Sequence, residues 1–279
     1  MSSVILVTGC SSGIGQSTAI ALARAGHTVY ATARKPDTLG PCVAAGCRPL
    51  ALDVNNEASM AAAVATIEAA HGAVDVLVNN AGYSVSGALE SLSIDAVRRQ
   101  FETNVFGLLR LSQLVLPAMR AAKTGRIINI SSMGGTFTFP GGGAYHASKY
   151  AVEALSDALR FEVKPFGIQV VVIQPGLIRT HFGDTAASAV PGHEDVYASF
   201  NAAVAKATRE VYETGPLAKL GGEPEAVAAV IARVVEAKRP KARYTVTPSA
   251  TLLMTTRRLL SDAGWDLFLA SSFPSPAAG

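Results

Sequence analysis

A tyrosine, a lysine and a serine have the residue types and the spacing that proton transfer requires. Tyr145 and Lys149 are four residues apart, which on an α-helix places their side chains on one face, one turn apart. A free phenol has a pKa of about 10, but a nearby ammonium group favours the phenolate and lowers that pKa. Ser132 precedes the pair across a glycine-rich loop that contains a proline. If this loop folds back, two hydroxyl groups converge on one substrate oxygen.

The segments around these residues are typical of an open α/β sheet. Residues 126–130 form an apolar run that predicts a buried strand ending just before Ser132, and residues 144–166 have a helical pattern that carries Tyr145 and Lys149. Functional residues of such sheets lie at the carboxyl ends of the strands. A tyrosine followed four residues later by a lysine is a common coincidence, but this context favours a functional pair.

A second motif has the form of a phosphate-binding loop. Gly9, Gly13 and Gly15 follow a short β-branched run at residues 4–7 and precede a helical pattern. Glycines let the backbone turn tightly and approach a pyrophosphate, while the start of a helix offers unpaired N–H groups and the positive end of its dipole. The spacing is Gly-x3-Gly-x-Gly, which differs from the common Gly-x-Gly-x2-Gly, and the alternative is a plain glycine turn.

The end of the next predicted strand bears on the choice of nucleotide. Residues 28–33 predict a strand, and Arg34 and Lys35 follow it. A carboxylate at this place would bind the adenosine ribose hydroxyls and repel a 2′-phosphate, whereas a guanidinium suits a phosphate. We therefore expect NADP(H) to be preferred over NAD(H). The alternative is that both cations are ordinary loop charges.

Polar and small residues follow two further predicted strands. Residues 48–52 run into Asp53, which could accept a hydrogen bond from an adenine amino group or simply cap a turn. Residues 74–78 are followed by Asn-Asn-Ala-Gly at 79–82. The small residues would let the backbone lie against a cofactor, and the amide side chains could tie adjacent loops together.

Asn104 interrupts the apolar face of a long helical pattern at residues 93–122. A buried asparagine needs hydrogen-bond partners. It is either a satisfied core amide at a helix kink or a polar link to the catalytic group.

The order of the elements predicts one domain, residues 1–279, with an α/β fold. Strands alternate with helices, as in a doubly wound parallel sheet with helices on both faces. The composition agrees, because 49% of the residues are hydrophobic and only 16% are charged. A sixth strand is predicted at residues 169–173, before Pro175 and Gly176, and a last one at residues 244–246.

Two later segments do not show this alternation of strands and helices. Residues 181–222 predict a mostly helical flap beside the substrate, able to exclude water on closure. The tail, residues 248–279, mixes large apolar residues with a few cations. It either closes the pocket or joins a subunit contact, with a membrane-surface anchor as the weaker alternative.

Charge and cysteine content argue against several other classes of protein. A net charge of +3 is too small to indicate nucleic-acid binding. The three cysteines have no metal-ligand spacing, so no metal site is predicted, and a reducing, cytoplasmic compartment is the simplest expectation. The N-terminus lacks the basic region of a signal peptide, and no run of 18 apolar residues predicts a transmembrane segment.

Six motifs together resemble a classical short-chain dehydrogenase/reductase. They are TGCSSGIG at 8–15, NNAG at 79–82, Asn104, Ser132, YHASK at 145–149 and PG at 175–176. They occur in the family's order over residues 4–180, and their co-occurrence is far more specific than any one motif. The resemblance implies a single Rossmann-like domain. Residues 29–39 and 145–168 are similar to the hydroxysteroid and retinol dehydrogenase branch.

The resemblance also implies a role for each matching residue. Tyr145 is the general acid/base, and Lys149 binds the nicotinamide ribose and lowers the phenol pKa. Ser132 holds the substrate oxygen, and Asn104 supports a water molecule in a proton relay. The residues predicted to bind the cofactor, from the motifs and the resemblance together, are Gly9, Ser11, Ser12, Gly13, Ile14, Gly15, Arg34, Asp53, Val54, Asn79, Ala81, Gly82, Tyr145, Lys149, Pro175, Gly176, Ile178 and Thr180.

The leading hypothesis is an NADP(H)-dependent oxidoreductase that interconverts a secondary alcohol and a ketone or aldehyde on a lipophilic, steroid- or retinoid-like molecule. The alternatives are a reductase of small carbonyl or acyl compounds, a nucleotide-binding regulatory module without turnover, and an isomerase or dehydratase. The apolar stripes of the helices at 93–122 and 144–166, together with the family resemblance, predict a homodimer or homotetramer.

Overall fold

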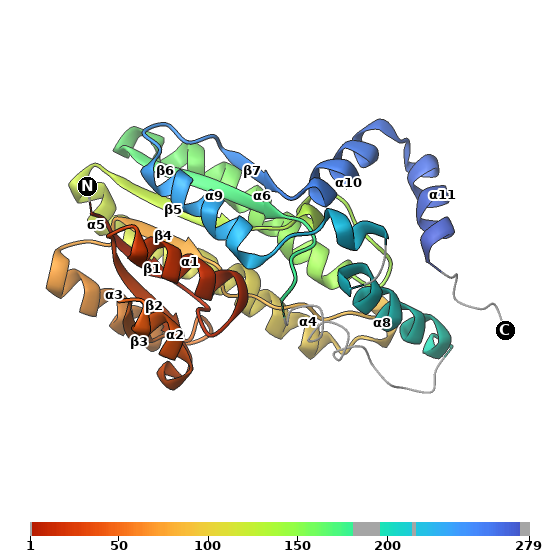
Figure 1. The fold of residues 1–279 in the computed structure, drawn as a ribbon, viewed down its shortest axis with the longest axis horizontal. Helices are drawn as coiled ribbons and strands as arrows, with labels where there is room; N and C mark the ends of the chain where they lie inside the picture. The colour runs from red at the N-terminus through yellow and green to blue at the C-terminus, as the bar shows by residue number, and fades with distance from the viewer. Residues whose placement is uncertain (1, 181–195, 214–215, 274–279) are drawn as a thin grey trace.

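The computed structural model describes residues 2–180, 196–213 and 216–273, and its centre is a seven-stranded parallel sheet (Figure 1). The strand order is β3-β2-β1-β4-β5-β6-β7. The strands are β1 (Val4–Val7), β2 (Thr28–Ala33), β3 (Arg48–Ala51), β4 (Val76–Asn79), β5 (Gly125–Ile130), β6 (Ile168–Pro175) and β7 (Arg243–Val246). The predicted doubly wound α/β fold is therefore confirmed.

Helices cover both faces of this sheet (Figure 1). Those packed on it are α1 (Gly13–Arg24), α2 (Gly40–Ala44) and α9 (Pro224–Glu236) on one face, and α3 (Glu57–His71), α5 (Gly107–Ala122) and α6 (Gly143–Val163) on the other. Successive side chains of a strand point to opposite faces. Accordingly Ile5 and Val7 lie in the core beneath α1 and α9, while Leu6 lies in the core beneath α3 and α5.

The strand order creates a crevice at the carboxyl ends of the strands. From β1 the chain first moves outward to β2 and β3, then returns to place β4 on the other side of β1. The loops after β1 and β4 therefore separate at the carboxyl ends of these strands, where doubly wound sheets bind their ligands.

The predicted long helix at 93–122 contains a break in its regular hydrogen bonding. It consists of α4 (Ile94–Phe101), one π-helical turn (Glu102–Phe106) and α5. Asn104 lies in the π turn, and such turns are frequent at functional sites. Of the described residues, only the segment 94–122 is long and apolar enough to cross a bilayer. Leu111, Val115 and Met119 of this segment are fully buried against the sheet, as in a core helix of a globular domain.

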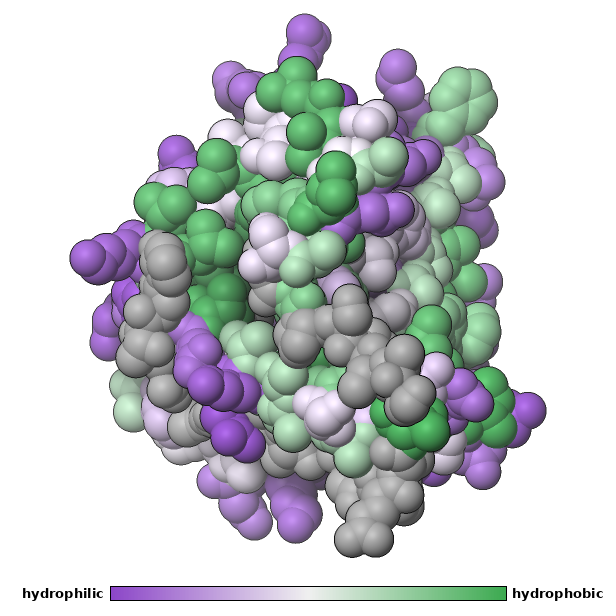
Figure 2. All heavy atoms as spheres, turned by 90° about the vertical axis from the view of Figure 1, so that its right-hand side faces the viewer, coloured by the Kyte–Doolittle hydropathy of each residue, from purple (hydrophilic) through white to green (hydrophobic). Residues whose placement is uncertain are grey.

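Three helices of the last third of the chain lie beyond the carboxyl ends of the strands (Figure 1). They are α8 (Ala198–Glu213), α10 (Pro248–Leu259) and α11 (Asp262–Ser272). The space-filling view of this end shows hydrophobic residues gathered around a recess (Figure 2). The predicted flap at 181–222 lies partly outside the described residues, and its described part is α8 and a short 3₁₀ helix (Pro216–Leu220).

Candidate active site

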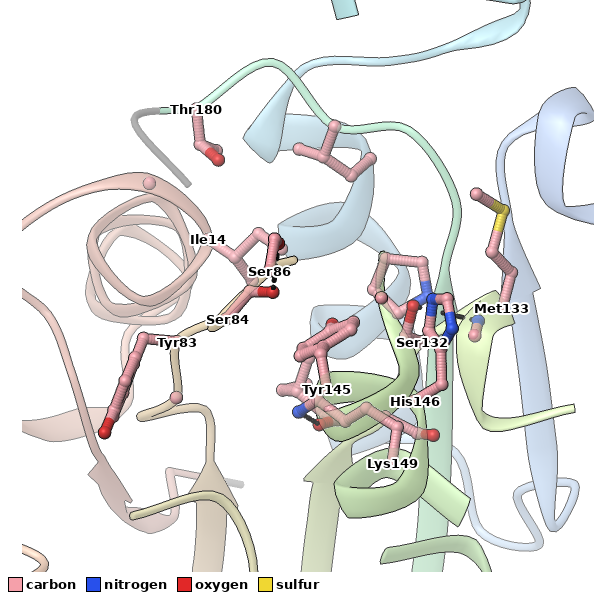
Figure 3. Close-up of a pocket in the computed structure, with 18 of the residues that line it drawn as sticks. Ile14, Tyr83, Ser84, Ser86, Ser132, Met133, Tyr145, His146, Lys149 and Thr180 are labelled. Carbon is pink, nitrogen blue, oxygen red and sulfur yellow. Dashed lines mark hydrogen bonds between the residues drawn. The ribbon is translucent and has the colours of Figure 1, made fainter. Parts of the chain in front are cut away.

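Ser132, Tyr145 and Lys149 lie on the wall of one pocket, and Figure 3 shows the side chains of Ser132 and Tyr145 directed into it. Ser132 follows β5, and its Oγ accepts a hydrogen bond of 3.0 Å from the backbone N–H of Gly134. The hydroxyl proton of Ser132 therefore stays available to a substrate oxygen. Tyr145 and Lys149 lie one turn apart near the start of α6, with the lysine Nζ 5.8 Å from the centre of the phenol ring.

The amine of Lys149 is buried, and a nearby carboxylate partly compensates its charge. Burial lowers the pKa of Lys149 to about 8, and the nearby carboxylate of Glu153 acts in the opposite direction by stabilising the cation. Glu153 is itself held by two hydrogen bonds, one from Gln174 on β6 at 3.0 Å and one from Arg243 on β7 at 2.9 Å. The charge that opposes the desolvation of Lys149 thus belongs to a fixed network across the sheet.

Asn104 connects the loop after β4 to the catalytic helix. Its Oδ1 accepts from the backbone N–H of Tyr83 at 3.0 Å, and its Nδ2 donates to the carbonyl oxygen of Tyr83 at 2.9 Å and to Ser148 Oγ at 3.0 Å. Ser148 Oγ in turn donates to the carbonyl oxygen of Tyr145 at 2.7 Å. This chain of bonds favours the interpretation of Asn104 as a polar link to the catalytic group. The amide oxygen and nitrogen of Asn104 are both engaged in these hydrogen bonds, and the residue does not line the pocket.

The loop after β1 forms a cradle that only glycine allows. Gly9 and Gly13 have φ angles of +70° and +57°, in the left-handed region that favours glycine. A Cβ atom on Gly15 would lie 2.2 Å from the carbonyl oxygen of Gly9. Asn80 holds this loop, because its Nδ2 donates to the carbonyl oxygens of Thr8 and Gly9 at 2.9 and 3.2 Å. The start of α1 is thereby fixed at the pocket wall.

The far end of the pocket carries the residues predicted to meet the adenosine part of the cofactor. Arg34, directly after β2, lines the pocket, and so do Asp53 and Val54 after β3. Asp53 Oδ1 also accepts a hydrogen bond of 2.9 Å from the backbone N–H of Asn55. The turn-cap use considered for Asp53 therefore occurs, and the residue also lines the pocket, while its contact with adenine stays a prediction.

Most of the predicted site residues come together in this pocket. Those on its wall are Gly9, Ser11, Ser12, Gly13, Ile14, Arg34, Asp53, Val54, Ala81, Gly82, Ser132, Tyr145, Lys149, Pro175, Gly176, Ile178 and Thr180. Gly15, Asn79 and Asn104 are placed behind the wall. Asn79 is 4% exposed, and its Nδ2 donates to Asn129 Oδ1 at 2.9 Å and to Ser112 Oγ at 3.1 Å. Its amide is thus a core contact between β4, β5 and α5, and the neighbouring Asn80 takes the position at the pocket.

Sequence reasoning did not select three further polar residues of the pocket, Ser84, Ser86 and His146. The two serines lie in the loop after β4, and their hydroxyl groups are 3.4 Å apart (Figure 3). His146 directly follows Tyr145, and its ring lies beside Ser132 (Figure 3). The only sequence signal for it was its place within the YHASK motif.

The rest of the pocket wall is largely apolar, with Thr208 and Glu210 of α8 among its polar residues, and comes from elements far apart in the chain. The apolar residues include Met133, Phe137, Phe139, Val204, Val211, Leu217, Leu253, Phe268 and Phe273. Phe139 packs its ring 5.0 Å from that of Phe137, 6.2 Å from that of Trp265 and 5.9 Å from that of Phe273, measured between centroids. The expectation that the tail closes the pocket is consistent with these contacts at α11 and with the place of Leu253, from α10, in the pocket wall.

This combination of a glycine cradle, a Ser-Tyr-Lys group and a doubly wound sheet agrees with comparisons to known proteins. The sequence model of the family described as short chain dehydrogenase matches residues 3–190. The chain belongs to the short-chain dehydrogenase family. It is therefore an oxidoreductase of the NAD(P)-dependent short-chain type.

Three relatives show how far the similarity of this short-chain dehydrogenase extends. It is 41% identical over 253 residues to 3-ketodihydrosphingosine reductase of Bacteroides thetaiotaomicron, with 90% of each chain covered. The crystal structure of a short-chain dehydrogenase from Streptomyces avermitilis superposes with a TM-score of 0.81 at 35% identity, covering 97% of both chains. A metagenomic short-chain oxidoreductase solved in complex with NADP has a TM-score of 0.68 at 29% identity, with 88% of this chain and 96% of that chain covered.

Proposed function

We propose that this short-chain dehydrogenase reduces a ketone on a long-chain lipid with NADPH as the hydride donor. The observation that carries the proposal is the form of the pocket, which has a volume of about 990 Å³ and a wall that runs from the glycine cradle to the apolar residues of α8, α10 and α11. The catalytic hydroxyls lie between these two parts. A nucleotide and an apolar chain can therefore meet at Tyr145.

The residues present fit an NADP cofactor. Gly9 and Gly13 bring bare backbone to the pocket wall, and a Cβ atom on Gly13 would stand between this loop and Thr180, 3.2 Å from Thr180 Cγ2. The N-terminus of α1 offers N–H groups to a pyrophosphate. Arg34 offers a guanidinium at the end of β2, where an acidic side chain would repel a 2′-phosphate. The complex of a related short-chain oxidoreductase with NADP supports binding of this nucleotide.

The reaction requires the protein to orient the ketone and to supply one proton. When bound, NADPH supplies the hydride that adds to the carbonyl carbon. Ser132 Oγ and the phenol of Tyr145 donate hydrogen bonds to the carbonyl oxygen as it gains negative charge, which is where preorganised donors lower a barrier most. Tyr145 then transfers its proton to that oxygen. The cation of Lys149 stabilises the phenolate that remains.

The similarity to 3-ketodihydrosphingosine reductase makes a long-chain ketone the first substrate to test. The apolar half of the pocket supports the same class, because Val204, Leu253 and Phe137 present almost fully buried side chains around it.

The deciding experiment measures NADPH consumption with 3-ketodihydrosphingosine, a steroid ketone, retinal and a short aliphatic ketone. We expect the highest kcat/KM for the long-chain ketone. A higher value for the short ketone would favour the reductase of small carbonyls, and an unchanged nicotinamide absorbance with product formed would favour an isomerase or dehydratase. Absence of turnover across the panel would favour a regulatory nucleotide-binding module.

Two further expectations belong to this proposal. The three cysteines are buried and unpaired, which supports a reducing, cytoplasmic compartment. A homodimer or homotetramer through α5 and α6 is supported by exposed aromatic side chains there, with Phe106 51%, Tyr150 43% and Phe161 83% exposed. Sedimentation equilibrium tests the assembly, and a monomer at micromolar concentration would reject it.

A further inference from the structure

His146 places a polar ring at the junction between the catalytic hydroxyls and the apolar half of the pocket. Its side chain lines the pocket beside Ser132, and its ring centroid is 5.7 Å from that of Tyr145 and 6.1 Å from that of Phe139. The residue is 7% exposed. A polar side chain buried to this extent needs a hydrogen-bond partner for each ring nitrogen.

The protein supplies a partner for one of the two nitrogens. Nδ1 accepts a hydrogen bond of 3.2 Å from the backbone N–H of Phe139. An imidazole that accepts at Nδ1 carries its proton on Nε2, so the second nitrogen is a donor. In the described part of the chain no group accepts a hydrogen bond from Nε2. The donor is therefore left for a ligand.

The imidazole occupies space that is free only because two neighbouring residues are glycines. A Cβ atom on Gly134 would lie 2.5 Å from Cδ2 of His146 and 2.9 Å from its Nε2, and a Cβ on Gly142 would lie 2.6 Å from its Cε1. Any other residue at either position would collide with the imidazole. The same Cβ on Gly134 would be 3.5 Å from Ser132 Oγ. Nε2 of His146 and the hydroxyl that binds the ketone oxygen thus flank one glycine.

The ring is neutral over the working pH range of such enzymes. Burial lowers the pKa of His146 to about 4. The described residues around the ring include the uncharged Phe139 and Ser132, the phenol of Tyr145 and the two glycines. A neutral Nε2–H donates one hydrogen bond to an oxygen and cannot accept one from an ammonium group.

We infer that His146 determines substrate specificity by donating a hydrogen bond from Nε2 to an oxygen substituent close to the reacting ketone. The inference rests on the proposed reduction of a long-chain ketone and adds to it the class of the neighbouring group. The favoured substrate carries a hydroxyl or carbonyl oxygen one or two carbons from the ketone and an apolar chain on the other side. His146 transfers no proton in this scheme, and Tyr145 stays the acid.

Two substitutions separate this role from a purely structural one. His146→Asn keeps an oxygen where Nδ1 accepts from Phe139 and removes the donor at Nε2. His146→Gln places an amide donor near Nε2 and gives up the Nδ1 contact. The readout is the ratio of kcat/KM for a long-chain 1-hydroxy-3-ketone to kcat/KM for the 3-ketone of the same length. Comparing this ratio between variants cancels the intrinsic reactivity of the two ketones.

We expect the wild-type protein to prefer the hydroxyketone and His146→Asn to lose roughly fivefold to tenfold of that preference, as the loss of one neutral hydrogen bond implies. His146→Gln should retain most of it, and the control Glu162→Gln, at an exposed position of α6, should match the wild type. The preference should stay constant between about pH 6 and pH 8, since the ring does not titrate there.

The inference is overturned if His146→Asn keeps the wild-type ratio, or if both variants lower the two kcat/KM values equally, which is the result of a structural role. If His146→Asn does not fold, His146→Leu, which also lacks a donor at Nε2, replaces it, and a wild-type ratio in that variant would refute the hydrogen bond. These results leave the reduction of long-chain ketones intact. Failure to oxidise NADPH with either ketone would instead reject the proposed function, and this inference with it.

Discussion

Lys149 Nζ donates a hydrogen bond of 2.8 Å to the carbonyl oxygen of Ile130, the last residue of β5. This bond ties α6 to the strand that leads directly into Ser132. The backbone that positions the serine therefore also positions the amine, and through α6 the phenol of Tyr145. All three groups thus lie together at the carboxyl end of one central strand.

The charge of Lys149 predicts how activity depends on pH. Burial lowers the pKa of Lys149 to about 8, so the cation is the major form below that pH and is lost above it. Because the cation stabilises the phenolate left by Tyr145, kcat/KM for ketone reduction should fall as the pH rises through about 8. The measurement is a pH profile at saturating NADPH. A flat profile up to about pH 10 would contradict the role given to the amine.

Glu153 is predicted to set the pH at which kcat/KM falls. Its carboxylate stabilises the Lys149 cation against the effect of burial. Glu153→Gln removes that charge but keeps hydrogen-bonding groups for Gln174 and Arg243, so the pKa of Lys149 should drop and the fall in kcat/KM should move to lower pH. Glu162→Gln, at an exposed position of the same helix, is the matched control. Identical profiles for the two variants would exclude a positioning role for Glu153.

Arg34 is predicted to be the residue that distinguishes the two nucleotides. A charge-assisted hydrogen bond contributes about 1.5–3 kcal/mol, so Arg34→Ala should lower kcat/KM for NADPH by roughly tenfold to a hundredfold. The value for NADH should change little. Lys35→Ala, at the next exposed position, is the control. An equal loss with both nucleotides, or an unaltered preference, would show that Arg34 does not contact the 2′-phosphate.

Gly15 is predicted to be intolerant of any side chain. A Cβ atom would stand 2.2 Å from the backbone oxygen of Gly9, and backbone cannot move as a flexible side chain does. Gly15→Ala should destabilise the fold by about 1–3 kcal/mol and weaken NADPH binding. Gly40→Ala, where no atom lies within 4 Å of the new Cβ, should leave both unchanged. Thermal unfolding with and without NADPH measures the difference, and equal melting temperatures would refute the clash.

The fold was predictable because its signals are local. The strands at 4–7 and 28–33 coincide with the observed β1 and β2, since apolar β-branched runs bounded by turns are read directly from the sequence. The short helix α2 was missed because its five residues, Gly40–Ala44, are too few to show a helical period. The break at Asn104 was visible as a polar residue on an apolar face, but its π-helical form was not.

The site was predictable where a motif carries the chemistry and unpredictable where tertiary contacts do. Adjacent asparagines at 79 and 80 point to opposite sides of the strand end, and only the structure shows that Asn80 holds the cradle while Asn79 joins the core. The role of His146 could not be predicted, because it depends on Gly134 and Phe139, which the folded loop brings against its ring. The apolar wall of the pocket is formed by several helices, and the periodicity of each helix does not show that they meet at one pocket.

The most direct test of the account is the turnover of Tyr145→Phe with NADPH and a long-chain ketone. The substitution removes the proton donor and keeps the ring, so kcat should fall by about 10²–10⁴-fold while NADPH binding, measured by nucleotide fluorescence, is retained. Tyr150→Phe, at an exposed position of the same helix, should behave as the wild type. Turnover of Tyr145→Phe close to that of the wild type would contradict the assignment of the phenol as the acid.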